Sequence, residues 1–103
     1  MVLVDSSVWI RYFGNRMPYA HELGRLIDLD VVAGHELVYG ELLIGDSGGR
    51  RKQLSDYEYL YLARTVLHPE VVEFVRSRHL HGRGLNWIDV HLLASAVAER
   101  LQL

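Results

Sequence analysis

The first ten residues read MVLVDSSVWI, and residues 2–5 of this stretch decide the class of fold. Val2-Leu3-Val4 is a short apolar run that ends directly at an acid, Asp5. Such runs are typical of strands that are buried on both faces of a parallel sheet. Ligands bind at the carboxyl ends of these strands, so Asp5 is well placed for chemistry. Asp5 would also serve as the N-cap of a helix that begins at Ser6.

The alternation of short apolar runs with helical patterns continues along the whole chain. Strands are expected at residues 2–4, 31–33 and 65–67. Helices are expected at residues 6–13, from 18 onward, at 35–44, at 51–64, from 69 onward and at 86–101. The tyrosines at 57, 59 and 61 leave a strand open as an alternative for part of residues 51–64. The order β-α-α-β-α-α-β-α-α predicts an α/β fold with a parallel sheet covered by helices on both faces.

The composition limits the size and setting of the protein. The chain has 103 residues, which fits a single domain over residues 1–103. It has no cysteine, which excludes disulfides and thiolate-bound zinc and favours a reducing, cytoplasmic setting. No apolar run approaches the ~20 residues of a membrane span. The formal net charge of −2 argues against a broad basic face, so any nucleic acid would have to be attracted by a local arginine cluster or by a metal.

Three acids have both a functional and a structural interpretation. Asp5 follows a strand and can cap a helix. Glu41 lies within an apolar helical pattern, where it is either paired or metal-bound on the core side, or exposed at the edge of the apolar stripe. Asp89 follows Asn86 by three residues, which resembles a capping box. Carboxylates that are brought together repel one another unless a cation binds them.

Oxygen ligands alone favour Mg²⁺ or Mn²⁺ over zinc. A divalent ion held by such acids can orient a water molecule, lower its pKa and stabilise charge on a phosphate. The three acids therefore suggest metal-assisted hydrolysis of a phosphodiester.

Three segments carry a family resemblance: VDSSVWI near the N-terminus, VYGELLIG in the middle and GRGLNWIDVHLLASA near the end. Together they resemble the PIN-domain family, and within it the VapC-type toxins of bacterial toxin–antitoxin pairs. The resemblance covers nearly the whole chain. It implies a three-layer α/β/α sandwich with a central parallel sheet, and a metal-dependent ribonuclease.

By motif, the resemblance places the catalytic and metal-binding acids of the family on Asp5, Glu41 and Asp89. Ser7 matches the small hydroxyl residue that follows the first acid and supports the site. The implied cofactor is Mg²⁺ or Mn²⁺. The implied partners are an RNA substrate, a cognate antitoxin and a second copy of the chain in a homodimer.

The chain departs from the family at its end. Family members continue into a strand with a Trp-Thr-Arg-Asp-like motif, whose Asp completes the acidic set, and this sequence ends before that point. We expect Leu101 and Leu103 to approach the sheet, and the C-terminus to be incomplete, without its last strand. The rival interpretation is therefore a catalytically impaired or truncated PIN fold that binds an antitoxin or RNA.

A basic run follows the Gly-rich loop Ser47-Gly48-Gly49. It consists of Arg50, Arg51 and Lys52. These side chains are candidates for contacts with RNA phosphates. The alternative is that they form the solvated start of a helix.

Overall fold

The computed structural model describes residues 1–103 and contains a three-stranded parallel sheet. The strands are β1 (Val2–Leu3), β2 (Val32–Gly34) and β3 (Tyr61–Leu62), in the spatial order β1-β2-β3. Val2 pairs with Val32, and Ala33 pairs with Tyr61. The central strand β2 is completely buried, as expected for a strand covered on both faces.

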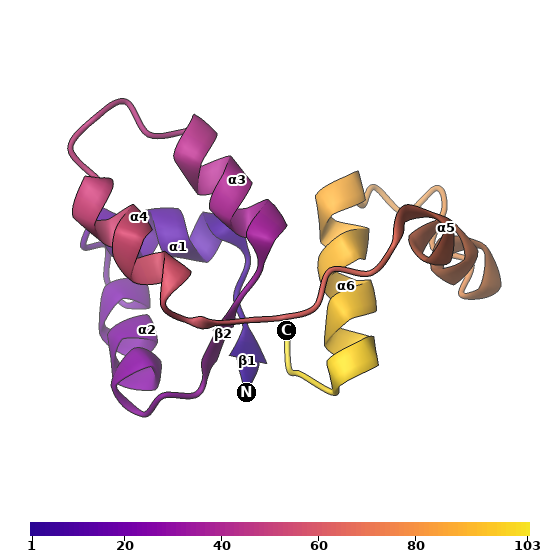
Figure 1. Ribbon diagram of the computed structural model, residues 1–103, viewed down its shortest axis with the longest axis horizontal. Coiled ribbons are helices and arrows are strands. Elements are labelled where there is room, and N and C mark those ends of the chain that lie inside the picture. Colours follow the sequence, from indigo (N-terminus) through magenta and orange to yellow (C-terminus); the bar gives the residue numbers. More distant parts are fainter.

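Six helices connect and cover these strands, in the predicted order. Their bounds are α1 (Ser6–Phe13), α2 (Tyr19–Asp28), α3 (Glu36–Ile44), α4 (Arg51–Glu58), α5 (His68–Ser77) and α6 (Trp87–Glu99). None of them is long and apolar enough to cross a membrane. Figure 1 shows α1 to α4 gathered on one side of the sheet and α6 on the other side, with α5 beyond α6. The predicted α/β architecture is confirmed.

The core follows from this layering. The larger cluster joins the sheet to α1–α4 and α6; its buried members include Leu3, Trp9, Val38, Tyr57 and Leu92. A smaller cluster lies between α5 and α6 and contains Val66, Val71, Val90 and Ala94. Because α6 contributes to both clusters, it joins α5 to the rest of the molecule.

The predicted position of the third strand was wrong. α4 ends at Glu58 instead of continuing to residue 64, and the strand lies at Tyr61–Leu62 instead of 65–67. The apolar residue that suggested a strand there, Val66, packs into the cluster between α5 and α6. The alternation of tyrosines, which left a strand open, indicated the correct segment.

The end of the chain returns to the sheet, as Leu101 and Leu103 suggested. Gln102 forms a parallel bridge with Val2, on the edge of β1 that β2 does not occupy. The amide of Leu3 donates to the Gln102 carbonyl at 2.7 Å, and the amide of Gln102 donates to the Met1 carbonyl at 3.1 Å. The two termini therefore lie side by side (Figure 1).

Candidate active site

Asp5 lies where β1 passes into α1, and its carboxylate caps that helix. Oδ1 accepts a hydrogen bond from the Val8 amide at 3.2 Å and another from the Ser7 hydroxyl at 2.7 Å. Both bonds go to the same oxygen, so Oδ2 remains available to a ligand. The structural and the functional interpretations of Asp5 are therefore compatible.

Asp89 has the same dual character in the first turn of α6. Its amide donates to the Asn86 side chain at 2.8 Å, and its Oδ2 accepts from the Asn86 amide at 3.2 Å. This is the predicted capping box. It fixes the carboxylate through one oxygen and leaves Oδ1 available.

The structure brings Asp5 and Asp89 to one pocket. Both acids line a pocket of about 180 Å³ whose other walls are apolar, formed by Leu85, Leu92, Leu93 and Leu103. In Figure 1 the carboxyl ends of β1 and β2 and the beginning of α6 point to the same, upper edge of the molecule. Two carboxylates from distant parts of the sequence thus meet where α/β proteins bind their ligands.

Glu41 does not share that pocket. Its side chain is exposed on the second turn of α3, so the solvent-facing alternative describes it. It lines a neighbouring hollow of about 160 Å³ together with Ile10, Phe13, Arg50 and others. No group of three or more acidic, histidine or cysteine side chains is gathered closely enough to hold a metal ion.

The pair Asp5 and Asp89 has the donor chemistry of a magnesium site. Mg²⁺ usually keeps several water molecules and binds through one or two carboxylates together with substrate phosphates. A pocket that presents one free carboxylate oxygen from each of two acids fits this requirement. Ser7 holds Asp5 in position by donating to its other oxygen.

The three basic residues that follow the Gly-rich loop have different surroundings in the structure. Lys52 forms an exposed ion pair with Asp56 at 3.0 Å, one turn further along α4. Arg51 is exposed at the start of the same helix. Arg50 is half-buried, and its guanidinium lies 5.3 Å from the centre of the Phe13 ring. Of the three, Arg50 alone lines the hollow that contains Glu41.

A buried histidine that the sequence analysis did not single out connects several elements. His35 is fully buried directly after β2 and caps α3, because its Nδ1 accepts from the Leu37 amide at 3.1 Å. Its Nε2 therefore carries the proton and donates to the Ser95 hydroxyl at 3.0 Å, which in turn donates to the Arg64 carbonyl at 2.8 Å. Burial lowers the pKa of His35, so the neutral ring is favoured. The signal in the sequence was a polar residue at the junction of a strand and a helix, the same position that Asp5 occupies.

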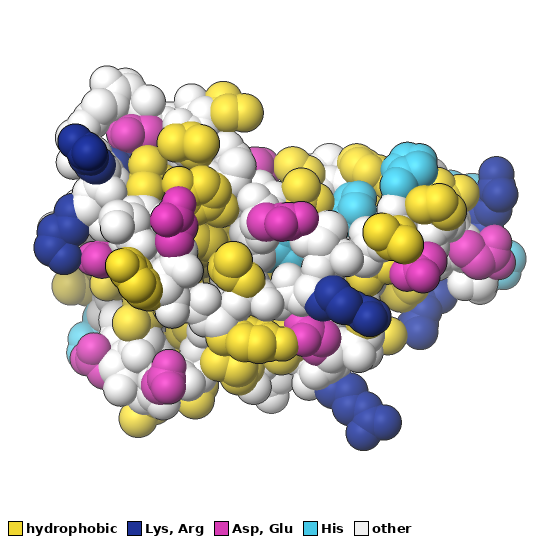
Figure 2. All heavy atoms as spheres, viewed as in Figure 1, with side chains coloured by type: hydrophobic (Ala, Val, Ile, Leu, Met, Phe, Trp, Pro, Cys, Tyr) yellow, Lys and Arg dark blue, Asp and Glu magenta, His cyan; other side chains and the backbone are white.

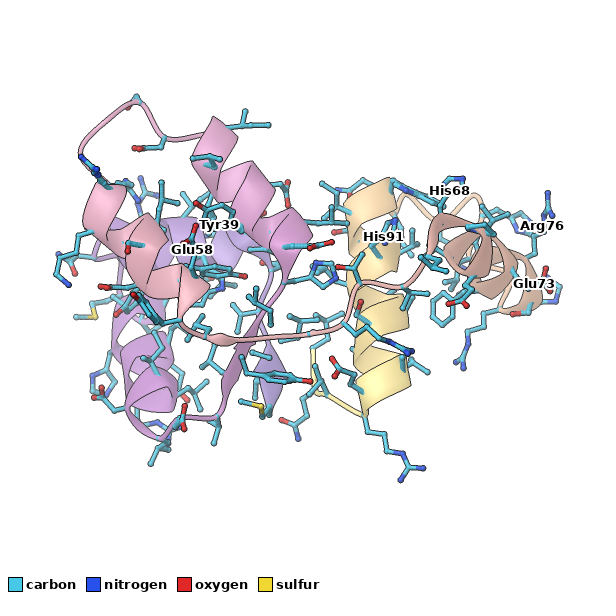
Figure 3. The ribbon with its side chains drawn as sticks, viewed as in Figure 1. Tyr39, Glu58, His68, Glu73, Arg76 and His91 are labelled. Carbon is cyan, nitrogen blue, oxygen red and sulfur yellow. The ribbon has the colours of Figure 1, made fainter.

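A third hollow, of about 300 Å³, lies between α3 and α4 and is separate from the site. Figure 3 shows Tyr39 of α3 beside Glu58 of α4, and both line it. The Glu58 carboxylate beside the Tyr39 hydroxyl raises the pKa of Tyr39. Because neither Asp5 nor Asp89 lines this hollow, it is not part of the candidate active site.

Comparison with known proteins identifies the family. The model of the PIN domain matches residues 2–103. The chain belongs to the PIN-domain family. This PIN domain is also similar to the protein named Ribonuclease VapC32 in Mycobacterium tuberculosis, in the strains CDC 1551 / Oshkosh and ATCC 25618 / H37Rv. The identity is 40% over 95 residues, which cover 92% of this chain and 74% of that protein.

No solved structure matches the chain. The family assignment therefore rests on sequence, and it confirms the resemblance predicted from the three motifs. Members of this family are generally dependent on a divalent metal, which agrees with the two carboxylates that line one pocket.

Proposed function

We propose that this PIN domain is a metal-dependent endoribonuclease and the toxin of a VapC-type toxin–antitoxin pair. The similarity to Ribonuclease VapC32 over nearly the whole chain supports the substrate class and the type of system. The observation that carries the proposal is the pocket shared by Asp5 and Asp89, in which each acid keeps one carboxylate oxygen free.

Each residue has a proposed role. Asp5 and Asp89 would hold Mg²⁺ or Mn²⁺, and Glu41 on the neighbouring helix is the third acid. Ser7 keeps Asp5 in position. When bound, a divalent ion lowers the pKa of coordinated water and neutralises charge on the phosphate. The apolar walls of the pocket limit the competing hydration of the acids, which strengthens their interaction with a cation.

RNA cleavage by matched variants tests the proposal. Asp5→Asn and Asp89→Asn remove a charge but keep the side-chain acceptor needed for the cap, because asparagine caps helices as well as aspartate does. We expect both variants to lose at least about 100-fold in the rate of Mg²⁺-dependent cleavage, equivalent to about 2.7 kcal/mol of transition-state stabilisation. Equal cleavage by wild type and Asp5→Asn would refute the assignment. Glu41→Gln tests the third acid separately, and cleavage at the wild-type rate would exclude Glu41 from the site.

One observation favours a second candidate function. Glu41 lines a different hollow from the other two acids, so the carboxylates do not form a three-acid cluster. A catalytically impaired PIN fold that binds an antitoxin or RNA would have this arrangement. Titration with Mn²⁺ distinguishes the two functions, since the absence of saturable binding would favour the binding module.

We also propose that the chain pairs with a cognate antitoxin and forms a homodimer. Large apolar side chains on α1 and α3 support an interface: Ile10 is 55% exposed, Leu43 50% and Ile44 89%. Exposed apolar groups of this kind mark protein contacts when they cluster. The basic side chains Arg50, Arg51 and Lys52 are proposed contacts for RNA phosphates.

A further inference from the structure

A hollow lined by arginine lies beside Asp5. Its volume is about 350 Å³. It is lined by Ser7, Ile10, Arg11, Gly14, Arg16 and Arg50. No acidic side chain lines it, although the chain as a whole has a formal net charge of −2. On the face drawn in Figure 2, acidic side chains lie among the basic ones and no broad basic area is seen. The hollow, with three arginines and no acid in its lining, is therefore a local concentration of positive charge.

Two of these guanidinium groups are positioned by neutral partners. Arg11 donates to the Ser7 carbonyl at 3.3 Å, and its guanidinium lies 5.0 Å from the centre of the Tyr19 ring. Arg50 lies over the Phe13 ring. None of the arginines of the hollow forms an ion pair, since both ion pairs of the molecule involve other side chains. The positive charges are therefore held in place without being neutralised, which leaves them available to an anion.

Ser7 links the hollow to the candidate active site. The Ser7 hydroxyl donates to Asp5 at 2.7 Å, and Ser7 also lines the hollow. Single-stranded RNA carries a phosphate at every nucleotide. A strand whose scissile phosphate lies at Asp5 would therefore bring a neighbouring phosphate towards the arginines. Guanidinium groups bind phosphate oxygens in a bidentate manner, with charge-assisted hydrogen bonds.

We infer that Arg11, Arg16 and Arg50 form a subsite for a backbone phosphate of the RNA next to the scissile one. The inference rests on the proposed ribonuclease function and assigns to it two residues, Arg11 and Arg16, that lie outside the basic run at 50–52. Phosphate contacts position the strand without reading its sequence. The subsite therefore contributes to affinity for every RNA sequence alike.

Binding of a fluorescein-labelled single-stranded RNA in EDTA tests the subsite without cleavage. The test variant is Arg11→Gln combined with Arg16→Gln. The control is Arg76→Gln combined with Arg83→Gln, which makes the same change in net charge on and just after α5; Figure 3 shows Arg76 at the far end of the molecule. Far-UV circular dichroism and thermal melting establish that both variants are folded. Cleavage with Mg²⁺ is measured in parallel for all three proteins.

We expect the test variant to bind RNA at least roughly tenfold more weakly, and the control to bind nearly as wild type. The slope of log K against log salt should decrease by about 1.4, which is about 0.7 for each lost contact with a single strand. The loss should be the same for RNAs of different sequence. Arg11→Lys with Arg16→Lys should lose less affinity, because the charge remains but the bidentate geometry does not.

Three outcomes would overturn the subsite. Equally weakened RNA binding in the test and control variants would show a general effect of net charge instead of a subsite. The proposed ribonuclease function would still hold in that case if the wild-type protein cleaves RNA. Unchanged RNA binding in the test variant would refute the subsite. If that variant, titrated with poly-glutamate in the same way, had lost binding, the hollow would instead be assigned to an acidic protein segment. If wild type neither binds nor cleaves RNA, the proposed function fails together with the subsite.

Discussion

A single carboxylate can serve folding and chemistry at once. Oδ1 of Asp5 accepts hydrogen bonds from the Val8 amide and the Ser7 hydroxyl, whereas Oδ2 accepts neither of them. Asp89 divides its oxygens in the same way within the capping box. The cap orients each carboxylate before any ligand binds, which lowers the entropy that binding would cost. A functional acid at a helix cap is therefore consistent with its structural role and needs no separate explanation.

Stability measurements on Asp5 variants separate these two roles. Asp5→Ala removes the cap and should lower the free energy of unfolding by about 1 kcal/mol, within a range of about 0.5–2 kcal/mol. Asp5→Asn keeps the acceptor and should remain within about 0.5 kcal/mol of wild type. Urea denaturation of the two variants checks this. A loss of stability in Asp5→Asn as large as in Asp5→Ala would mean that the charge, rather than the cap, supports the fold.

At the scale of the elements, the packing of β2 against β3 depends on a glycine. A Cβ added to Gly34 would lie 2.9 Å from Cδ2 of Leu62 and 3.1 Å from the Tyr57 ring. Tyr57 is 2% exposed, and its hydroxyl bonds to the His35 backbone. The aromatic ring therefore has little room to move away.

Alanine substitution at two glycines tests this close approach. We expect Gly34→Ala to destabilise the fold by about 1–3 kcal/mol through overpacking. Gly40→Ala is the matched control, because a Cβ there meets nothing within 4 Å and Gly40 lies inside α3. Alanine at that helical position should stabilise the protein by up to about 1 kcal/mol. Urea denaturation of both variants provides the measurement. An unchanged denaturation midpoint for Gly34→Ala would show that the Tyr57 ring can move aside.

The elements that the sequence predicted correctly are those with a local signal. The strand predicted at residues 2–4 and observed at Val2–Leu3 lies just before an acid, and the last helix begins with a capping box, so both are recognisable within a few residues. The third strand was misplaced because its partner contacts are distant. Glu99 of α6 accepts from the Tyr61 hydroxyl and from the Arg64 amide, and no pattern near residue 61 reveals that partner.

The candidate site, like the elements, could be predicted only where the signal is local in the sequence. Asp5 and Asp89 share a pocket as their motifs suggested, but the position of Glu41 depends on how α3 leaves the sheet. The arginine hollow was missed because Arg11 and Arg16 are 34 and more residues from Arg50 in sequence. Only the spacing of Ser7 and Arg11, four residues apart on one helix face, was available as a signal.

At the scale of the whole molecule, His35 links the two sides of the sheet. It caps α3, its backbone bonds to Tyr57 of α4, and its ring bonds to Ser95 of α6. The cap of α3 needs a neutral ring, because a protonated Nδ1 could no longer accept from the Leu37 amide. His91 is the second buried histidine, packed edge-on against Trp87 with no partner for its Nδ1. Figure 3 shows His91 on α6 and His68 on α5. Burial and, to a smaller degree, the charge of His68 lower the pKa of His91.

These two histidines predict how stability depends on pH. Since their pKa values in the folded protein lie below the ordinary 6.5, the unfolded chain binds more protons at mildly acidic pH. The free energy of unfolding should therefore be largest above pH 6.5 and fall as the pH decreases below it, by up to about 1.4 kcal/mol per pH unit for each histidine. Urea denaturation between pH 7.5 and about 5 measures this slope, before the carboxylates titrate.

Two variants separate the contributions of the histidines to this slope. His91→Gln should retain the share of the slope that belongs to His35, whereas His35→Gln should lose that share along with the bond to Ser95. If the slope were unchanged in His35→Gln and absent in His91→Gln, the junction around His35 would not be the element that responds to acid.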